Sequence, residues 1–154
     1  MDNQKETLAE RAVSLFLDGY NCAQALYGAA APLLGIEEKE ALRLASPFGG
    51  GFGRQREVCG AFSGMMLAIA NFYGYDDLND PKKSELYPRV QELGKRFQSA
   101  CGSLVCREIL GKNVEVGGSA SPRTKAYYES RPCAYVVEQA AQILERYLKE
   151  EGSL

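Results

Sequence analysis

The sequence contains no histidine and no tryptophan among its 154 residues. Without histidine, this chain alone cannot form a Ser-His-Asp or Cys-His catalytic site. A Cys₂His₂ zinc site is excluded for the same reason, and so is haem attachment through a CxxCH motif. A site for a soft metal ion would therefore have to be built mainly from cysteine.

The sequence also lacks a strong net charge and long apolar runs. Its 18 basic and 20 acidic residues leave a net charge of −2, which gives no electrostatic footprint for DNA or RNA. The longest clear apolar run, Met65 to Ala70, is too short to span a bilayer. The segment MDNQKETLAE at the start has no apolar core of the kind found in signal peptides. We therefore expect a cytoplasmic protein without membrane insertion.

Period-two alternation, the mark of half-buried strands, is absent as well. Apolar residues instead recur at spacings of three and four, which indicates amphipathic helices. The length and the 45% hydrophobic content fit one domain, residues 1–154. We expect an all-α protein, a single compact bundle of six or seven helices. The predicted helices cover Lys5 to Leu17, a segment carrying Cys22 to Ala29, Glu37 to Leu44, Val58 to Tyr73, a segment from Pro81 through Phe97, Cys106 to Gly111, and Pro132 to Lys149.

Four of the five cysteines share one placement. Cys22, Cys59, Cys106 and Cys133 each lie in the first turn of a predicted helix and begin its apolar stripe. If these helix starts lie at one level of the bundle, the four sulfurs converge. Unpaired amides and the positive dipole end at a helix start stabilise a thiolate, which is both the nucleophile and the metal ligand. The alternative interpretation is that these cysteines are small hydrophobic residues of the core.

A glycine-rich segment, Ser46 to Gly53, precedes Cys59. It does not match GxGxxG, and no predicted strand precedes it, so nucleotide binding is disfavoured. We expect its glycines to bring the backbone close to the sulfurs. Gly60 and Gly64, four residues apart, would allow a neighbouring helix to approach closely. Arg54 and Arg56 could stabilise the thiolate of Cys59 or bind an anionic substrate.

The segment from Cys59 to Gly64 reads CGAxxG, with Asn21-Cys22 before it and Cys106 and Cys133 after it. This arrangement, from Leu15 to about Leu148, resembles the family named for its C, GCAxxG, C, C cysteine pattern, whose members are described as redox-active. The resemblance implies a small helical protein with four signature cysteines. A related domain is associated with split-Soret cytochromes, which favours electron transfer and an iron–sulfur site, although the haem motifs are missing here. Cys101 has no counterpart in the pattern.

Three functions are compatible with these residues. In the first, Cys22, Cys59, Cys106 and Cys133 perform thiol–disulfide exchange with a redox partner that the sequence does not identify. No cofactor is then required, and the chain would be a thiol–disulfide oxidoreductase. In the second, the same four thiolates hold zinc or an iron–sulfur cluster, although no two are spaced as CxxC or another close pair. In the third, the chain is a helical interaction module with structural cysteines. The apolar helices are also compatible with a homodimer.

We predict that Cys59 is the most reactive thiol. It begins a well-patterned helix, and two arginines precede it closely. Cys133, between Pro132 and Tyr135 on the strongest apolar stripe, should be slowed by burial. Cys101 should lie outside the site.

Overall fold

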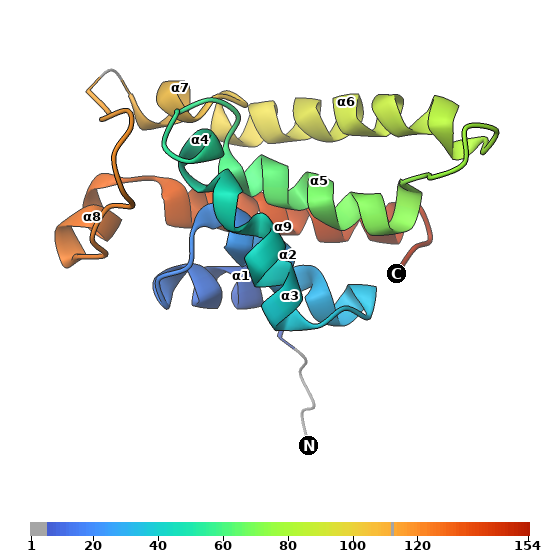
Figure 1. Ribbon diagram of the computed structural model, residues 1–154, viewed down its shortest axis with the longest axis horizontal. Coiled ribbons are helices and arrows are strands. Elements are labelled where there is room, and N and C mark those ends of the chain that lie inside the picture. Colours follow the sequence, from blue (N-terminus) through green and yellow to red (C-terminus); the bar gives the residue numbers. More distant parts are fainter. Residues whose placement is uncertain (1–5, 112) are drawn as a thin grey trace.

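The computed structural model describes residues 6–111 and 113–154. Over these residues the fold is all-α. Its β-type backbone pairing is a single isolated antiparallel bridge between Val58 and Val105. The elements, drawn in Figure 1, are α1 (Leu8–Leu17), α2 (Cys22–Leu34), α3 (Glu38–Ala45), the 3₁₀ turn η1 (Ser46–Phe48), α4 (Gly49–Phe52), α5 (Gly60–Tyr73), α6 (Lys82–Cys101), α7 (Cys106–Leu110), α8 (Lys125–Ser130) and α9 (Cys133–Glu150).

The predicted all-α bundle is confirmed, since α1, α2, α3, α5, α6 and α9 are the long helices that form its body. The observed helix boundaries agree closely with those predicted from the sequence. Asn21 caps α2 by accepting a hydrogen bond from the amide of Gln24 at 2.9 Å, as its type predicts. One predicted helix boundary, Lys5, lies outside the described residues. The short elements η1, α4 and α8 were not predicted.

Helix α2 occupies the centre of the bundle and packs against α1, α3, α5 and α9. Its buried residues are mostly alanine, which lets neighbouring helices approach. The closest approach is to α5. A Cβ at Gly64 would lie 2.6 Å from the carbonyl oxygen of Ala23, so only glycine fits there. The predicted close packing at Gly60 and Gly64 is thus confirmed, and it places the start of α2 beside the start of α5.

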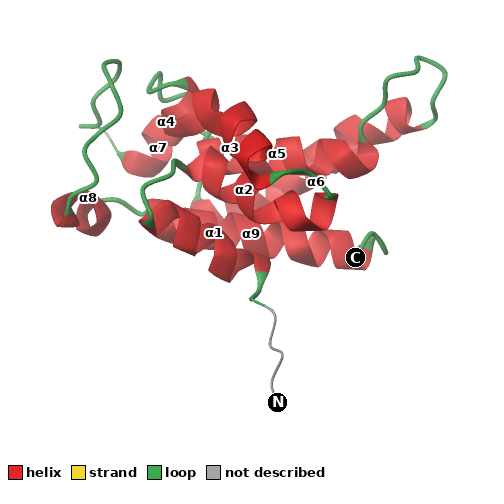
Figure 2. Cartoon of the chain, turned by 60° about the horizontal axis from the view of Figure 1, so that its bottom comes forward, coloured by secondary structure: helices red, strands yellow, loops and turns green. Residues whose placement is uncertain are grey.

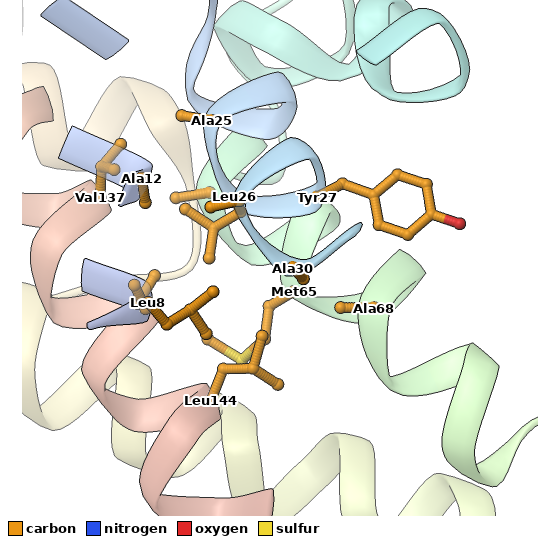
Figure 3. Close-up of a cluster of buried hydrophobic side chains, with 14 of the residues drawn as sticks. Leu8, Ala12, Ala25, Leu26, Tyr27, Ala30, Met65, Ala68, Val137 and Leu144 are labelled. Atoms are coloured by element: carbon orange, nitrogen blue, oxygen red, sulfur yellow. The ribbon is translucent and has the colours of Figure 1, made fainter. Parts of the chain in front are cut away.

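The apolar core lies between α1, α2, α5 and α9 (Figure 3). Leu8, Leu26, Met65 and Leu144 come from these four helices, point into one cluster and are 0–1% exposed. Burying a side chain of this size contributes roughly 1.5–3 kcal/mol to stability. Because α1 packs on α9, the two ends of the described chain are held together through the same core (Figure 2).

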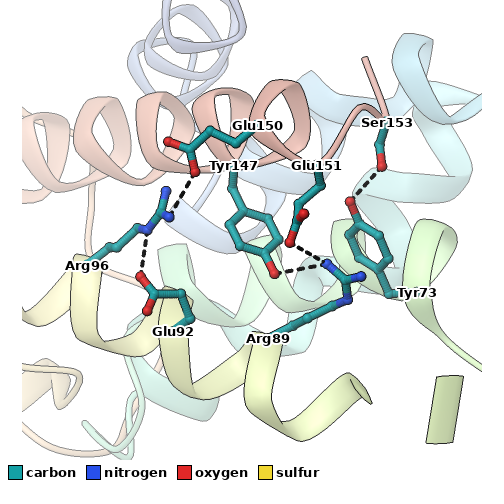
Figure 4. A network of polar contacts seen from close by, with 8 residues as sticks. All are labelled: Tyr73, Arg89, Glu92, Arg96, Tyr147, Glu150, Glu151 and Ser153. Carbon is teal, nitrogen blue, oxygen red and sulfur yellow. Dashed lines mark hydrogen bonds and ion pairs between the residues drawn. The ribbon is translucent and has the colours of Figure 1, made fainter. Parts of the chain in front are cut away.

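A polar network fastens the C-terminal end of α9 to α5 and α6 (Figure 4). Arg89 donates to the hydroxyl of Tyr147 at 3.0 Å and to Glu151 at 2.8 Å, and its guanidinium lies 3.9 Å from the centroid of the Tyr73 ring. Arg96 bridges Glu92 and Glu150, both at 2.8 Å. Tyr73 ends α5, so this network lies at the opposite end of that helix from Cys59.

None of the helices in residues 6–111 and 113–154 is long and apolar enough to cross a bilayer.

Candidate functional site

The four signature cysteines line one small cavity of about 50 Å³. Cys22, Cys106 and Cys133 are the first residues of α2, α7 and α9, and Cys59 is the N-cap of α5. Figure 1 shows the starts of α5 and α9 at the same end of the molecule as α4, α7 and α8. The predicted convergence of the four is confirmed. Cys101, at the end of α6, does not line this cavity.

The bridge between Val58 and Val105 brings two of these cysteines together. The amide of Cys59 donates to the carbonyl of Leu104 at 2.7 Å, and the amide of Cys106 donates to the carbonyl of Glu57 at 2.6 Å. These two bonds join segments that lie 47 residues apart in the sequence, counted from Cys59 to Cys106. They fix the starts of α5 and α7 side by side.

The glycine-rich segment approaches the sulfurs as predicted. Gly50 and Gly51 both have a φ of 67°, in the left-handed region that glycine adopts without strain. A Cβ at Gly51 would lie 2.8 Å from Cβ of Cys106, and a Cβ at Gly60 would lie 2.6 Å from Sγ of Cys22. The backbone therefore passes so close to the cavity that side chains at these positions would displace the cysteines.

The left-handed conformation continues past the glycines. Phe52, Arg54 and Arg56 have φ values of 66°, 67° and 61°. Each such non-glycine residue costs on the order of 1–3 kcal/mol. The amides of Arg56 and Glu57 donate to the carbonyls of Gly50 and Gly51, which closes the turn. Strain of this kind is typical of functional sites, and here it orients the two arginines.

Cys22 carries the thiolate of the site. Its pKa is lowered to about 6, chiefly because the thiol of Cys59 hydrogen bonds to its sulfur. The backbone amides of Gly50, Cys22 and Ala23 add to this effect and outweigh the opposing effect of burial. The pKa of Cys59 is correspondingly raised, first by the same hydrogen bond and then by burial. The two pKa values shift in opposite directions because the two thiols act on one another, so the pair favours a single thiolate, with Cys22 as the group whose ionisation is favoured.

The other three cysteines are thiols at neutral pH. Burial raises the pKa of Cys133 to about 12 and that of Cys101 to about 11. Burial also raises the pKa of Cys106, although a hydrogen bond from Arg56 opposes the shift. The expected slowing of Cys133 by burial agrees with this direction.

Of the two grounds on which Cys59 was predicted to be the most reactive thiol, the structure confirms the helix start and contradicts the nearby arginines. Neither preceding arginine reaches it. Arg56 donates from Nη1 toward Sγ of Cys106 at 3.8 Å, and Arg54 donates from Nε to the carbonyl of Gly117 at 2.7 Å. The pKa of Cys59 is raised whereas that of Cys22 is lowered, so the shift that favours ionisation falls on Cys22.

Sequence reasoning missed two charged side chains of the cavity, Arg123 and Arg131. Arg123 donates to the carbonyl of Tyr20 at 2.8 Å, and its guanidinium lies 4.6 Å from the centroid of the Phe16 ring. The guanidinium of Arg131 lies 4.5 Å from the centroid of the Tyr127 ring. Arg131 could have been identified as a candidate from the sequence, because it lies shortly before Cys133, as Arg56 lies shortly before Cys59.

Throughout the described ranges, no three cysteine, aspartate or glutamate side chains are grouped so that they could hold a metal ion. A Cys₄ zinc or iron–sulfur site therefore stays a prediction.

The family model described as "Putative redox-active protein (C_GCAxxG_C_C)" matches residues 20–147, most of the chain. No curated protein and no solved structure matches the sequence significantly.

Proposed function

Since this chain belongs to the C_GCAxxG_C_C family, we propose that it is a thiol–disulfide oxidoreductase whose reactive pair is Cys22 and Cys59. The observation that supports this proposal best is the placement of Cys22 and Cys59 at the closely packed starts of α2 and α5, where both line one cavity and the pKa of Cys22 is lowered to about 6. An ionised sulfur beside a protonated one is the arrangement that disulfide exchange needs, because the first attacks and the second resolves.

The proposed reaction has two steps. Sγ of Cys22 attacks one sulfur of a substrate disulfide, which forms a mixed disulfide and releases the other substrate sulfur as a thiolate. The Cys59 thiol then passes its proton to a leaving thiolate, and its sulfur attacks Sγ of Cys22. This step forms the Cys22–Cys59 disulfide and releases the second half of the substrate. The substrate gains two electrons, which the cysteine pair loses.

Cys106 and Cys133 have a different role in the proposed reaction. Both line the cavity, but their raised pKa values keep them as thiols at neutral pH. They would form a second pair that takes over the disulfide only after Cys22 and Cys59 have been oxidised. The number of thiols lost on oxidation, two or four, distinguishes a single pair from a relay.

The test is a count of thiols with peptide mapping. The reduced chain, purified without oxygen, is treated with bis(2-hydroxyethyl) disulfide, and disulfide-linked peptides are identified by mass. We expect a peptide pair joining Cys22 to Cys59 and the loss of at least two thiols. In Cys59→Ser, the mixed disulfide should accumulate on Cys22. Cys101→Ser is the control and should behave as the wild type.

Two results would contradict the proposal. One is a protein that keeps all five thiols under these conditions. The other is stoichiometric zinc, or iron with sulfide, in the protein as purified, since thiolates bound to a metal would favour the Cys₄ alternative.

A further inference from the structure

A second cavity of about 200 Å³ adjoins the cysteine cavity. The two share several lining residues, among them Gly50, Arg56, Arg123 and Arg131. The larger cavity is lined by four arginines, Arg54, Arg56, Arg123 and Arg131, and its lining includes no aspartate or glutamate. A positive pocket of this kind contrasts with the net charge of −2 of the chain.

Arg56 lies at the junction of the two cavities and is 2% exposed. Its Nε donates to the carbonyl of Glu115 at 2.8 Å, and its Nη1 reaches Sγ of Cys106 at 3.8 Å. Its Nη2 is buried and has no hydrogen-bond partner within residues 6–111 and 113–154. A buried charged donor without a partner is costly, and an anion in the adjoining cavity would satisfy it.

The other three arginines are held mainly by groups that do not neutralise them. Arg123 is bound by backbone carbonyls and aromatic rings, and Arg131 stacks on Tyr127. Arg54 bonds to the carbonyl of Gly117 and to the hydroxyl of Ser121. Its ion pair with Glu115 spans 3.4 Å, and the Glu115 side chain is 88% exposed, so solvent screens that charge.

We propose that this arginine pocket binds the carboxylate of a small anionic disulfide and so delivers the disulfide sulfur to Cys22. Guanidinium groups bind carboxylates through paired hydrogen bonds, which gives both affinity and orientation. The pocket has room for a few non-hydrogen atoms, which suits an anionic group at the end of a short chain. The inference depends on the proposed function, because it names the class of substrate for the same cysteine pair.

Three disulfides with two-carbon arms test the inference through charge. They are 3,3′-dithiodipropionate, which is anionic, bis(2-hydroxyethyl) disulfide, which is neutral, and cystamine, which is cationic. The rate of each with the protein is divided by its rate with free 2-mercaptoethanol, because leaving-group pKa also affects exchange. At low ionic strength we expect the normalised rate of the anion to exceed that of the cation by about tenfold or more.

Substitutions of single arginines test whether the preference for the anionic disulfide comes from this pocket. Arg131→Gln should reduce the ratio of anion to cation several-fold, and Arg54→Gln provides a second variant if the first fails to fold. Arg146→Gln is the matched control, since it removes the same charge from the other end of α9 and should leave the ratio unchanged. In the wild type, sulfate should slow the reaction with dithiodipropionate more than that with the neutral disulfide when sodium chloride matches the ionic strength.

The outcomes separate the two proposals. If Cys22 reacts with all three disulfides at equal normalised rates, the anion pocket is wrong and the proposed function stands. The anion pocket is equally contradicted if both pocket variants fold and retain the full preference, or if sulfate slows both reactions equally. If Cys22 reacts with none of the three, the proposed function fails, and the substrate class fails with it.

Discussion

Gly60, the first residue of α5, lies so close to Cys22, the first residue of α2, that a Cβ at Gly60 would be 2.6 Å from Sγ of Cys22. Cys59 directly precedes Gly60 and lines the same cavity as Cys22, whose pKa it helps to lower to about 6. The two sulfurs come from the starts of α2 and α5, which glycines at positions 60 and 64 allow to pack tightly. Cys59 is itself held in place by the hydrogen bond from its amide to the carbonyl of Leu104. Helix packing thus brings two cysteines close enough for each to change the pKa of the other.

The first prediction concerns the pKa of Cys22. Alkylation of reduced protein by iodoacetamide, followed peptide by peptide from pH 5 to pH 9, should show half-maximal reactivity of Cys22 near pH 6. In Cys59→Ala the main stabilising hydrogen bond is lost, so the pKa of Cys22 should rise by at least about one unit, the scale of a charge-assisted hydrogen bond. Cys101→Ala should not change it. Faster alkylation of Cys59 than of Cys22 at pH 6 would refute this charge assignment.

The second prediction concerns stability against pH. Folding lowers the pKa of Cys22 from an ordinary value of 9.0 to about 6. Between these values the folded chain has lost a proton that the unfolded chain keeps, so the free energy of unfolding should rise with pH across this window. The upper limit is about 4 kcal/mol for three pKa units. The other four cysteines have raised pKa values in the folded chain, so they act in the opposite direction as the pH approaches 9, and the rise should be clearest between pH 6 and pH 8.

Urea titrations at pH 6, 7 and 8 with reductant present would measure this rise. Cys22→Ser removes the titrating group and should flatten the profile, whereas Cys101→Ser should keep it. A wild-type profile that is already flat would show that Cys22 is not ionised in the folded protein.

The third prediction concerns the contact of α2 with α5. Gly64→Ala would place a Cβ 2.6 Å from the Ala23 carbonyl oxygen, which is backbone and cannot move aside easily. We expect a loss of about 1–3 kcal/mol from overpacking. Gly94→Ala on α6 is the matched control, because its nearest neighbours lie at 3.8 Å and alanine favours the helix. Thermal unfolding of both variants gives the comparison. Equal stability would mean that α2 and α5 are farther apart than described.

The fourth prediction concerns the network at the far end of the bundle. Arg89→Ala removes hydrogen bonds to Tyr147 and Glu151 and the stacking on Tyr73. The free energy of unfolding should fall by roughly 1–2 kcal/mol. Arg43→Ala removes only an exposed pair with Glu40 and should cost no more than about 0.5 kcal/mol. Chemical denaturation would measure both. A cost for Arg43→Ala as large as that for Arg89→Ala would argue against this role of the network.

Much of the site could be predicted because its signals are local. Asn21 before Cys22 and Pro132 before Cys133 mark helix starts by their own chemistry, so the placement of these sulfurs follows from a few neighbouring residues. The apolar stripes then indicate that the sulfurs face inward. Helix α8, with six residues, is too short to show a period and was missed for that reason.

The electrostatics of the site could not be predicted from neighbouring residues. The direction of Arg54 and Arg56 depends on positive φ values, which these residue types rarely adopt, and on bonds to Gly117 and Glu115 some sixty positions away. Nearness in sequence placed both charges beside Cys59, whereas tertiary contacts turn them toward other partners. Long-range contacts, not propensity, therefore decided which thiol ionises.

The four sulfurs stand on four different helices, so oxidation would change the connectivity of the chain. A bond between Cys22 and Cys59 would close a ring that contains α2, α3 and α4. Restricting the unfolded chain in this way is worth about 4 kcal/mol for a ring of this length. The same free energy appears in the redox equilibrium, because folding that favours the ring also lowers the reduction potential of the ring-forming bond. The packing of the bundle would thus help to set the reduction potential of the cysteine pair, and a substitution far from the sulfurs that loosens the packing would change that potential.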